Sequence, residues 1–451
     1  MKNERERCVR PGARTLERKA TVGGPPWQIP VALLVLGVLA QLTAAAGLVT
    51  IARNLAEGIF DGPTQLAVVH LYGLGFLTLT IVGALLQLVP VVVRQQICGP
   101  PVAAILGAAL AMGAWLLAGG LWSGAAWPTS CGGSLLGVGG GVFLGYLARA
   151  LWRAGRAGTL GAPGVGIALA GLWFACVLIL GAVLAANTVH PFLQINLLQF
   201  IGAHAAVAII GWIGGTILAM SLRLAPMFVL SHGYWRAPGT AALVLWNISV
   251  PPIAFGIGIG SAPLALAGGV VLLVACAAAA TFLASVVRHR RRRLEAPIAH
   301  LALGLLATMG ATAALMLTRT GTFGLYQVVV PAVLAVLVGL GAGVTSGHLF
   351  KVLPMLVWTG RYAHLAGVGG APKLSDLYPA PLAIVEQWAF LTGFVLLVGG
   401  TAGGNGTVAE VGAGLLLLAA AAVAIAVVTI VVGRPRVRST PAIHLSSEPA
   451  A

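Results

Sequence analysis

Uninterrupted apolar runs of bilayer length constrain this chain more than any other feature of its sequence. One of them, residues 199–230, reads QFIGAHAAVAIIGWIGGTILAMSLRLAPMFVL. It is longer than the about 20 helical residues that a hydrocarbon core requires. Similar runs recur along the 451 residues, of which 59% are hydrophobic and only 8% charged. Because the runs are continuous rather than alternating, they predict transmembrane helices and exclude a β-barrel.

Twelve such spans are expected, forming an all-α polytopic membrane domain over residues 29–432. Their expected ranges are 29–52, 64–93, 101–123, 132–152, 164–187, 197–230, 238–260, 262–287, 297–318, 323–358, 380–402 and 407–432. The first could be mistaken for a signal peptide, but its apolar part is too long for one, so we interpret it as an anchor. Residues 1–28 form a basic tail and residues 433–451 a polar one.

The basic residues orient these spans. With the N-terminus inside, all but Arg53 and Arg319 of the 26 lysines and arginines fall on the inner side. The positive-inside rule therefore predicts a multi-pass protein of the inner (plasma) membrane with both termini cytoplasmic. This asymmetry and the lipid bilayer account for the net charge of +16 without nucleic acid as a partner. Five scattered cysteines without a CxxC pair indicate neither a disulfide framework nor a zinc site.

Three spans end in a similar motif, in which a polar residue precedes a proline by three positions. The motifs are Gln87-Leu-Val-Pro90, Arg223-Leu-Ala-Pro226 and Lys351-Val-Leu-Pro354. They predict three related blocks of four spans about a pseudo-threefold axis. A proline that breaks a helix frees carbonyl groups, and we expect the polar residue of each motif to satisfy them.

Acidic residues are nearly absent from the spans. Glu386 and Glu410 lie near span ends, where we expect them to reach water. The chain contains no HExxH, no GxSxG, no P-loop and no paired-carboxylate helix. Membrane protease, hydrolase and ATPase functions therefore lack their residues.

Two histidines occupy similar places in two of the blocks. His70 precedes Pro90 by 20 residues and His204 precedes Pro226 by 22, which places both near the outer face. Neutral imidazole is a ligand for haem iron and for copper. We expect the two to approach one another and to bind one cofactor, with His190 of an outer loop as a further candidate. The alternative is that both are packing residues.

A second pair lies deeper. His348 stands six residues before Pro354, in the inner half of its span, and His300 begins another span on the same side. The two are a further candidate metal pair. The alternative is that each caps a helix or reaches the interface.

The motifs VHLYGLGFLTLTIVGALLQLVP (69–90) and AHAAVAIIGWIGGTILAMSLRLAP (203–226) carry a resemblance to a known group. Over residues 30–430 the chain resembles subunit I of the haem-copper oxidases and nitric oxide reductases, and the divergent NnrS-like membrane proteins. The resemblance implies twelve helices in three arcs of four. It also implies a low-spin haem ligand at His70 and a copper ligand at His204.

The chain departs from that family at two places. The family has a His-His pair in span seven, where this chain has Leu245-Trp246-Asn247, and a His-x-His in span ten, where it reads Tyr326-Gln-Val-Val-Val-Pro. A complete binuclear centre and the family's proton routes are therefore not recognisable, and a complete terminal oxidase is not expected.

The resemblance thus implies a protein that binds haem b or copper and acts in redox chemistry, nitric oxide response or metal handling, with a respiratory or electron-transfer partner. Whether it is an enzyme stays open. A transporter or channel on the same scaffold, and a non-catalytic respiratory assembly subunit, are the alternatives.

Overall fold

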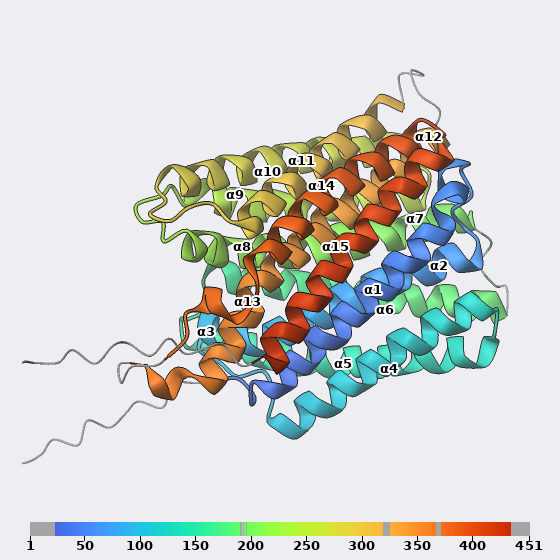
Figure 1. Ribbon diagram of the computed structural model, residues 1–451. Coiled ribbons are helices and arrows are strands. Elements are labelled where there is room, and N and C mark those ends of the chain that lie inside the picture. The colour runs from blue at the N-terminus through green and yellow to red at the C-terminus, as the bar shows by residue number, and fades with distance from the viewer. Residues whose placement is uncertain are drawn as a thin grey trace, which may run out of the picture.

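The protein is a bundle of long helices (Figure 1). The structure, a computed structural model, describes residues 23–189, 192, 194, 196–318, 325–366 and 371–433. Every secondary-structure element in these residues is helical. Twelve helices are long and apolar enough to cross a membrane, as the sequence predicts.

Nine of the spans are single helices, and their bounds agree with the expected ranges to within a few residues. They are α1 (Gln28–Ala56), α4 (Pro100–Ser123), α5 (Ala126–Arg156), α6 (Gly161–Val189), α9 (Ala237–Gly258), α10 (Ala262–Arg288), α11 (Ala296–Leu317), α14 (Ala380–Ala402) and α15 (Gly406–Val432). Hydrophobic length therefore suffices to place them.

The other three spans are interrupted by π-helical segments. The second span consists of α2 (Pro63–His70), η1 (Leu71–Thr78) and α3 (Leu79–Val93); the sixth of α7 (Leu197–Ala206), η2 (Val207–Gly214) and α8 (Gly215–Phe228); the tenth of α12 (Leu325–Leu334), η4 (Ala335–Gly343) and α13 (Val344–Arg361). By residue number, each π segment begins 19 residues before the proline of its span.

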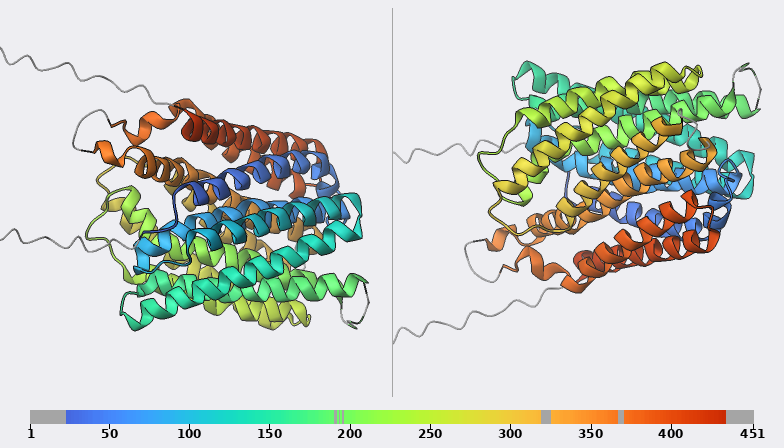
Figure 2. Two further views of the ribbon diagram at one scale, coloured as in Figure 1. Left: turned by 90° about the horizontal axis from the view of Figure 1, so that it is seen from below. Right: turned by 90° about the horizontal axis from the view of Figure 1, so that it is seen from above.

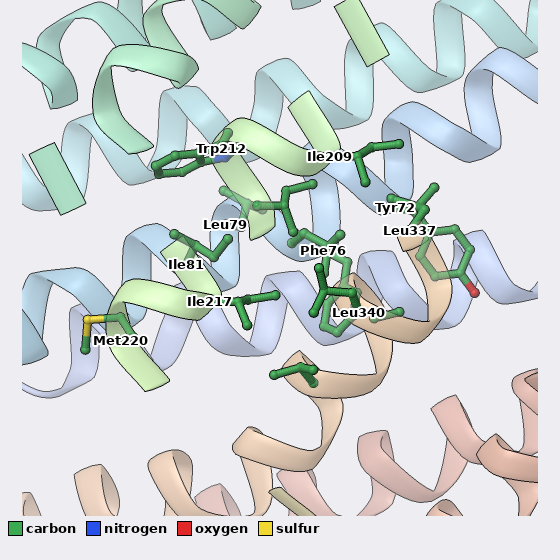
Figure 3. Packing of buried hydrophobic residues seen from close by; sticks show 14 of the residues in the cluster. Tyr72, Phe76, Leu79, Ile81, Ile209, Trp212, Ile217, Met220, Leu337 and Leu340 are labelled. Carbon is green, nitrogen blue, oxygen red and sulfur yellow. The ribbon is translucent and has the colours of Figure 1, made fainter. Parts of the chain in front are cut away.

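These three spans meet in the middle of the bundle, where contacts join every pair of π segments. Figure 3 shows side chains of all three spans packed together, among them Phe76, Trp212 and Leu340. The meeting point needs a small residue. A Cβ added to Gly341 would lie 2.9 Å from Leu77 Cδ1 and 3.6 Å from Ile213 Cγ2.

One end of the bundle gathers the basic loops. Arg94 follows α3, Arg156 ends α5, Arg288 ends α10 and Arg361 ends α13. We call this the basic end; α1 begins and α15 ends there (Figures 1 and 2). Arg53 lies at the opposite end, where it pairs with Glu410 through two contacts of 2.8 Å.

The prolines of the repeated motifs do not end their spans abruptly. Pro90 and Pro226 lie in the last turns of α3 and α8, whereas α13 continues from Pro354 to Arg361.

Two of the polar residues in these motifs have partners other than the expected ones. The Gln87 side-chain amide donates to the Pro25 carbonyl at 2.6 Å, and Lys351 pairs with Glu295. These residues join separate segments rather than satisfying carbonyls freed at the proline.

Candidate functional site

The first candidate site lies at the end opposite the basic loops, around His70. This residue is the last of α2 and directly precedes η1. Its Nδ1 contacts the Leu66 carbonyl oxygen at 2.7 Å. Because a carbonyl oxygen only accepts, Nδ1 carries the proton and Nε2 keeps a free lone pair. Metal-binding histidines are commonly oriented in this way.

His204 lies in α7, a short helix that begins at a well-formed cap. The Asn196 side chain accepts from the backbone N–H groups of Leu198 and Gln199. Nδ1 of His204 is buried and has no hydrogen-bond partner among the described residues. A buried polar atom without a partner costs about 1–3 kcal/mol, so such an atom calls for an explanation.

The two imidazoles lie close enough that a positive charge on His70 would disfavour one on His204, although 134 positions separate them in sequence. The space beside His204 is also bordered by α6, where a Cβ added to Gly181 would lie 3.4 Å from His204 Cε1. Two neutral imidazoles can serve haem iron as axial ligands. His190, the further candidate of the sequence analysis, lies outside the described residues.

His348 faces a cavity of about 80 Å³ between the second, sixth and tenth spans. The lining side chains form layers at matched distances before the three prolines. From the middle of the bundle toward the basic end, the layers are Thr80, Thr216 and Val344; Ile81, Ile217 and Thr345; Ala84, Met220 and His348; and Leu88, Leu224 and Val352. The cavity is thus built from corresponding residues of three spans, and the lining is almost entirely apolar.

His300 takes part in a different arrangement, a buried pair with Glu386. Its Nε2 lies 3.3 Å from Glu386 Oε1, and its Nδ1 contacts the Ala296 carbonyl at 2.9 Å. His300 is 2% exposed and Glu386 is 0% exposed. The expectation that Glu386 reaches water is therefore wrong, and His300 neither caps a helix nor reaches the interface.

His300 and His348 lie near one another, because a positive charge on His300 would act on His348. A Cβ added to Gly347 would lie 2.9 Å from His300 Nδ1, so His300 packs on the backbone next to His348. His348 itself lines the cavity and lies 5.4 Å, centroid to centroid, from the Phe228 ring. No group of three or more His, Cys, Asp or Glu residues suited to a metal ion occurs in the described part of the chain.

The span-seven residues that replace the expected histidine pair are engaged in packing. Trp246 Nε1 donates to the Ile210 carbonyl of η2 at 2.9 Å, and Asn247 Oδ1 accepts from Trp173 Nε1 at 2.9 Å. Both residues therefore fasten α9 to its neighbours.

Sequence reasoning missed Glu386 as a site residue and the three π segments altogether. Glu386 is the seventh residue of α14 and lies slightly deeper in its span than Glu410, the fifth residue of α15; an ionisable group within a span is a candidate functional residue. A scan against protein-family models found no match for this chain, and a search of curated proteins found none.

Proposed function

We propose that this protein is a membrane-embedded redox protein in which His70 and His204 hold a haem b, or failing that copper, near the end opposite the basic loops. The single observation that carries the proposal is the buried His204 Nδ1, which has no described hydrogen-bond partner and lies within electrostatic reach of His70. Coordination of a metal by a nitrogen of the His204 ring would give this imidazole the partner that the described chain does not supply.

His70 supports the same proposal. Its contact with the Leu66 carbonyl fixes the tautomer and the ring plane and leaves Nε2 free. Haem is favoured over copper because haem brings four ring nitrogens of its own, whereas a copper ion here would depend on protein ligands alone. The bound group would supply one-electron chemistry; the chain would orient both imidazoles and exclude water.

The proposed scaffold is three arcs of four spans about a pseudo-threefold axis, as in subunit I of the haem-copper oxidases and the NnrS-like proteins. Its support is the common start of η1, η2 and η4 relative to their prolines and the layered lining of the central cavity. We further propose that the basic end faces the cytoplasm of a bacterial inner membrane, because the described basic residues gather there.

Absorption spectroscopy and metal analysis of the purified protein test the cofactor proposal. Wild type is expected to show a haem spectrum. His70→Ala and His204→Ala are each expected to lose most of the bound cofactor while still inserting, since insertion depends on apolar length and basic loops. His348→Ala is the matched control and should retain it. A colourless, metal-free wild type, or full retention in both variants, would refute the assignment.

A transporter is the second candidate, and the cavity between three interrupted spans favours it, because broken helices at midplane commonly line substrate sites. Such a protein would purify without cofactor. The apolar lining restricts it to uncharged substrates. A non-catalytic assembly subunit would instead co-purify with a respiratory complex and tolerate both histidine variants.

A further inference from the structure

A second pocket opens at the basic end, between the start of α4 and the end of α5. It has a volume of about 220 Å³. One wall is the loop 96–99 before α4, and the other is a face of α5. The lining residues are Gln96, Ile97, Cys98, Gly99, Tyr146, Arg149, Ala150 and Arg153. We call these eight residues the arginine pocket.

Its charge is positive and uncompensated. Arg149 and Arg153 are four residues apart on α5, so their side chains project from one face of the helix. No ion pair joins either arginine to a carboxylate in the ranges that the structure describes. The next arginine, Arg156, has a partner of another kind, because its guanidinium lies 5.2 Å from the centre of the Trp152 ring. The pocket therefore holds two guanidinium groups without a counter-charge.

The opposite wall adds to the positive potential. Gly99 is the N-cap of α4, a helix of 24 residues, so the positive end of its dipole lies beside the pocket. The helix begins with Pro100 and Pro101, which have no N–H group, so this end adds positive potential but few hydrogen-bond donors. Tyr146, three residues before Arg149 on α5, also lines the pocket. Planar guanidinium forks match the oxygens of a phosphate, so the two arginines can supply the hydrogen bonds of such a site while the helix end adds positive potential.

The volume and the place of the pocket fit a phosphate that carries a small substituent. About 220 Å³ is several times the about 30 Å³ that one water molecule takes in the liquid. Trp152, which neighbours Arg153, is 62% exposed, as is typical of aromatic side chains at a membrane interface.

We propose that the arginine pocket binds the phosphate of an anionic ester, supplied by a phospholipid headgroup or by a soluble phosphate ester. Arg149 and Arg153 hold the phosphate oxygens, and the loop 96–99 encloses the substituent. This site is independent of the proposed cofactor, since none of its residues belongs to the second or the sixth span.

Calorimetric titration of the delipidated full-length protein tests the proposal with three probes. These are dioctanoyl phosphatidylglycerol, dioctanoyl phosphatidylcholine and glycerol 3-phosphate. Wild type is expected to bind phosphatidylglycerol more tightly than phosphatidylcholine. Binding of phosphatidylglycerol alone identifies the lipid as the source, whereas binding of glycerol 3-phosphate identifies the soluble ester.

The double variant Arg149→Gln/Arg153→Gln is expected to bind the preferred probe about 30-fold more weakly. Arg290→Gln/Arg292→Gln removes the same charge from a different loop and should bind as wild type does. Arg149→Lys keeps the positive charge but loses the two-pronged guanidinium group, so it should lose less affinity for the probe than the double variant does. It serves as the test if the double variant folds poorly. The proposal is overturned if the pocket variants bind the preferred probe as tightly as wild type does. It is also overturned if the loop variant loses as much affinity as the double pocket variant, or if wild type binds none of the three probes.

Discussion

Removal of the Glu386 carboxylate is expected to destabilise the protein more than removal of any other acid in the described residues. The carboxylate is fully buried and contacts His300 Nε2 at 3.3 Å. Neither of its oxygens has a well-formed hydrogen bond among the described residues. Its stability in this place therefore depends on the imidazole alone.

The magnitude follows from what each variant leaves behind. Glu386→Ala leaves His300 Nε2 without its partner in a closed site, and breaking a buried pair from one side costs about 3–5 kcal/mol. Glu386→Gln keeps the volume and a hydrogen-bonding group, so its cost should be about 1–2 kcal/mol. The double variant Glu386→Leu/His300→Phe replaces both polar groups by apolar ones. It should recover most of the loss, because a buried pair and an apolar pair are often of similar stability.

Unfolding in mixed micelles with increasing SDS, followed by circular dichroism, measures these differences. Glu410→Gln is the matched control, because Glu410 also pairs with a basic side chain but at the surface. The Arg53 side chain is 52% exposed and the Glu410 side chain 36%. That exposed pair should contribute far less. Should Glu386→Ala be no more destabilising than Glu410→Gln, or should the double variant be less stable than Glu386→Ala, the buried pair does not act as described.

Four further outcomes are expected. Burial raises the pKa of the Cys98 thiol to about 11. In a variant that keeps only this cysteine, maleimide labelling should therefore be slow at pH 7–9 and should rise steeply only as the pH approaches that value; fast labelling at pH 8 would contradict it. The thiol ionises more easily in the unfolded chain than in the folded protein. Raising the pH above about 9 should therefore lower the free energy of unfolding, and SDS unfolding in buffers of increasing pH measures this change. Thr78→Val removes the hydroxyl that accepts from Trp212 Nε1 at 3.0 Å and donates to the Gly73 carbonyl at 2.8 Å. It should cost about 1–3 kcal/mol in SDS unfolding, because the indole N–H is left without a partner in a buried place. Gly347→Ala places a Cβ 2.9 Å from His300 Nδ1 and should cost about 1–3 kcal/mol, with Gly310→Ala, which meets open space, as its neutral control.

The sequence predicted the spans well because their placement depends on one quantity, the length of apolar sequence between polar loops. Every expected range overlaps a helix of the structure, from α1 to α15. The π segments could not be predicted in this way. The segments η1, η2 and η4 consist mainly of glycine and aliphatic residues, like the α-helical parts beside them, and the aromatic residues Tyr72, Phe76 and Trp212 occur only in η1 and η2. No feature of the composition is therefore common to the three segments and absent from their neighbours.

The candidate site was predicted less completely, because burial in a bundle depends on which helices cover a residue. Glu386 is the seventh residue of α14, roughly 9 Å from the start of that helix. Depth along one helix suggested access to water. His300 of α11 and Phe390 of the next turn of α14 lie on this side of the bundle, and their rings are 5.2 Å apart. They shield the Glu386 carboxylate from water. Sequence position alone does not show this packing.

The common position of the π segments explains why the inner halves of the three spans correspond. Each residue turns an α-helix by about 100°, so an extra residue in one span alone would rotate everything after it away from its counterparts. All three spans carry a π segment at the same distance from the proline, and the residues ten, six and two positions before each proline still line one cavity.

His70 and His204 lie before their π segments and differ by two positions, a rotation of about 200° around a helix. They therefore do not occupy corresponding faces of their spans. Two residues on corresponding faces of helices arranged about an axis would both point toward that axis or both away from it. An offset of this size allows one imidazole to turn toward its neighbour instead, which is the relation that the proposed cofactor site requires.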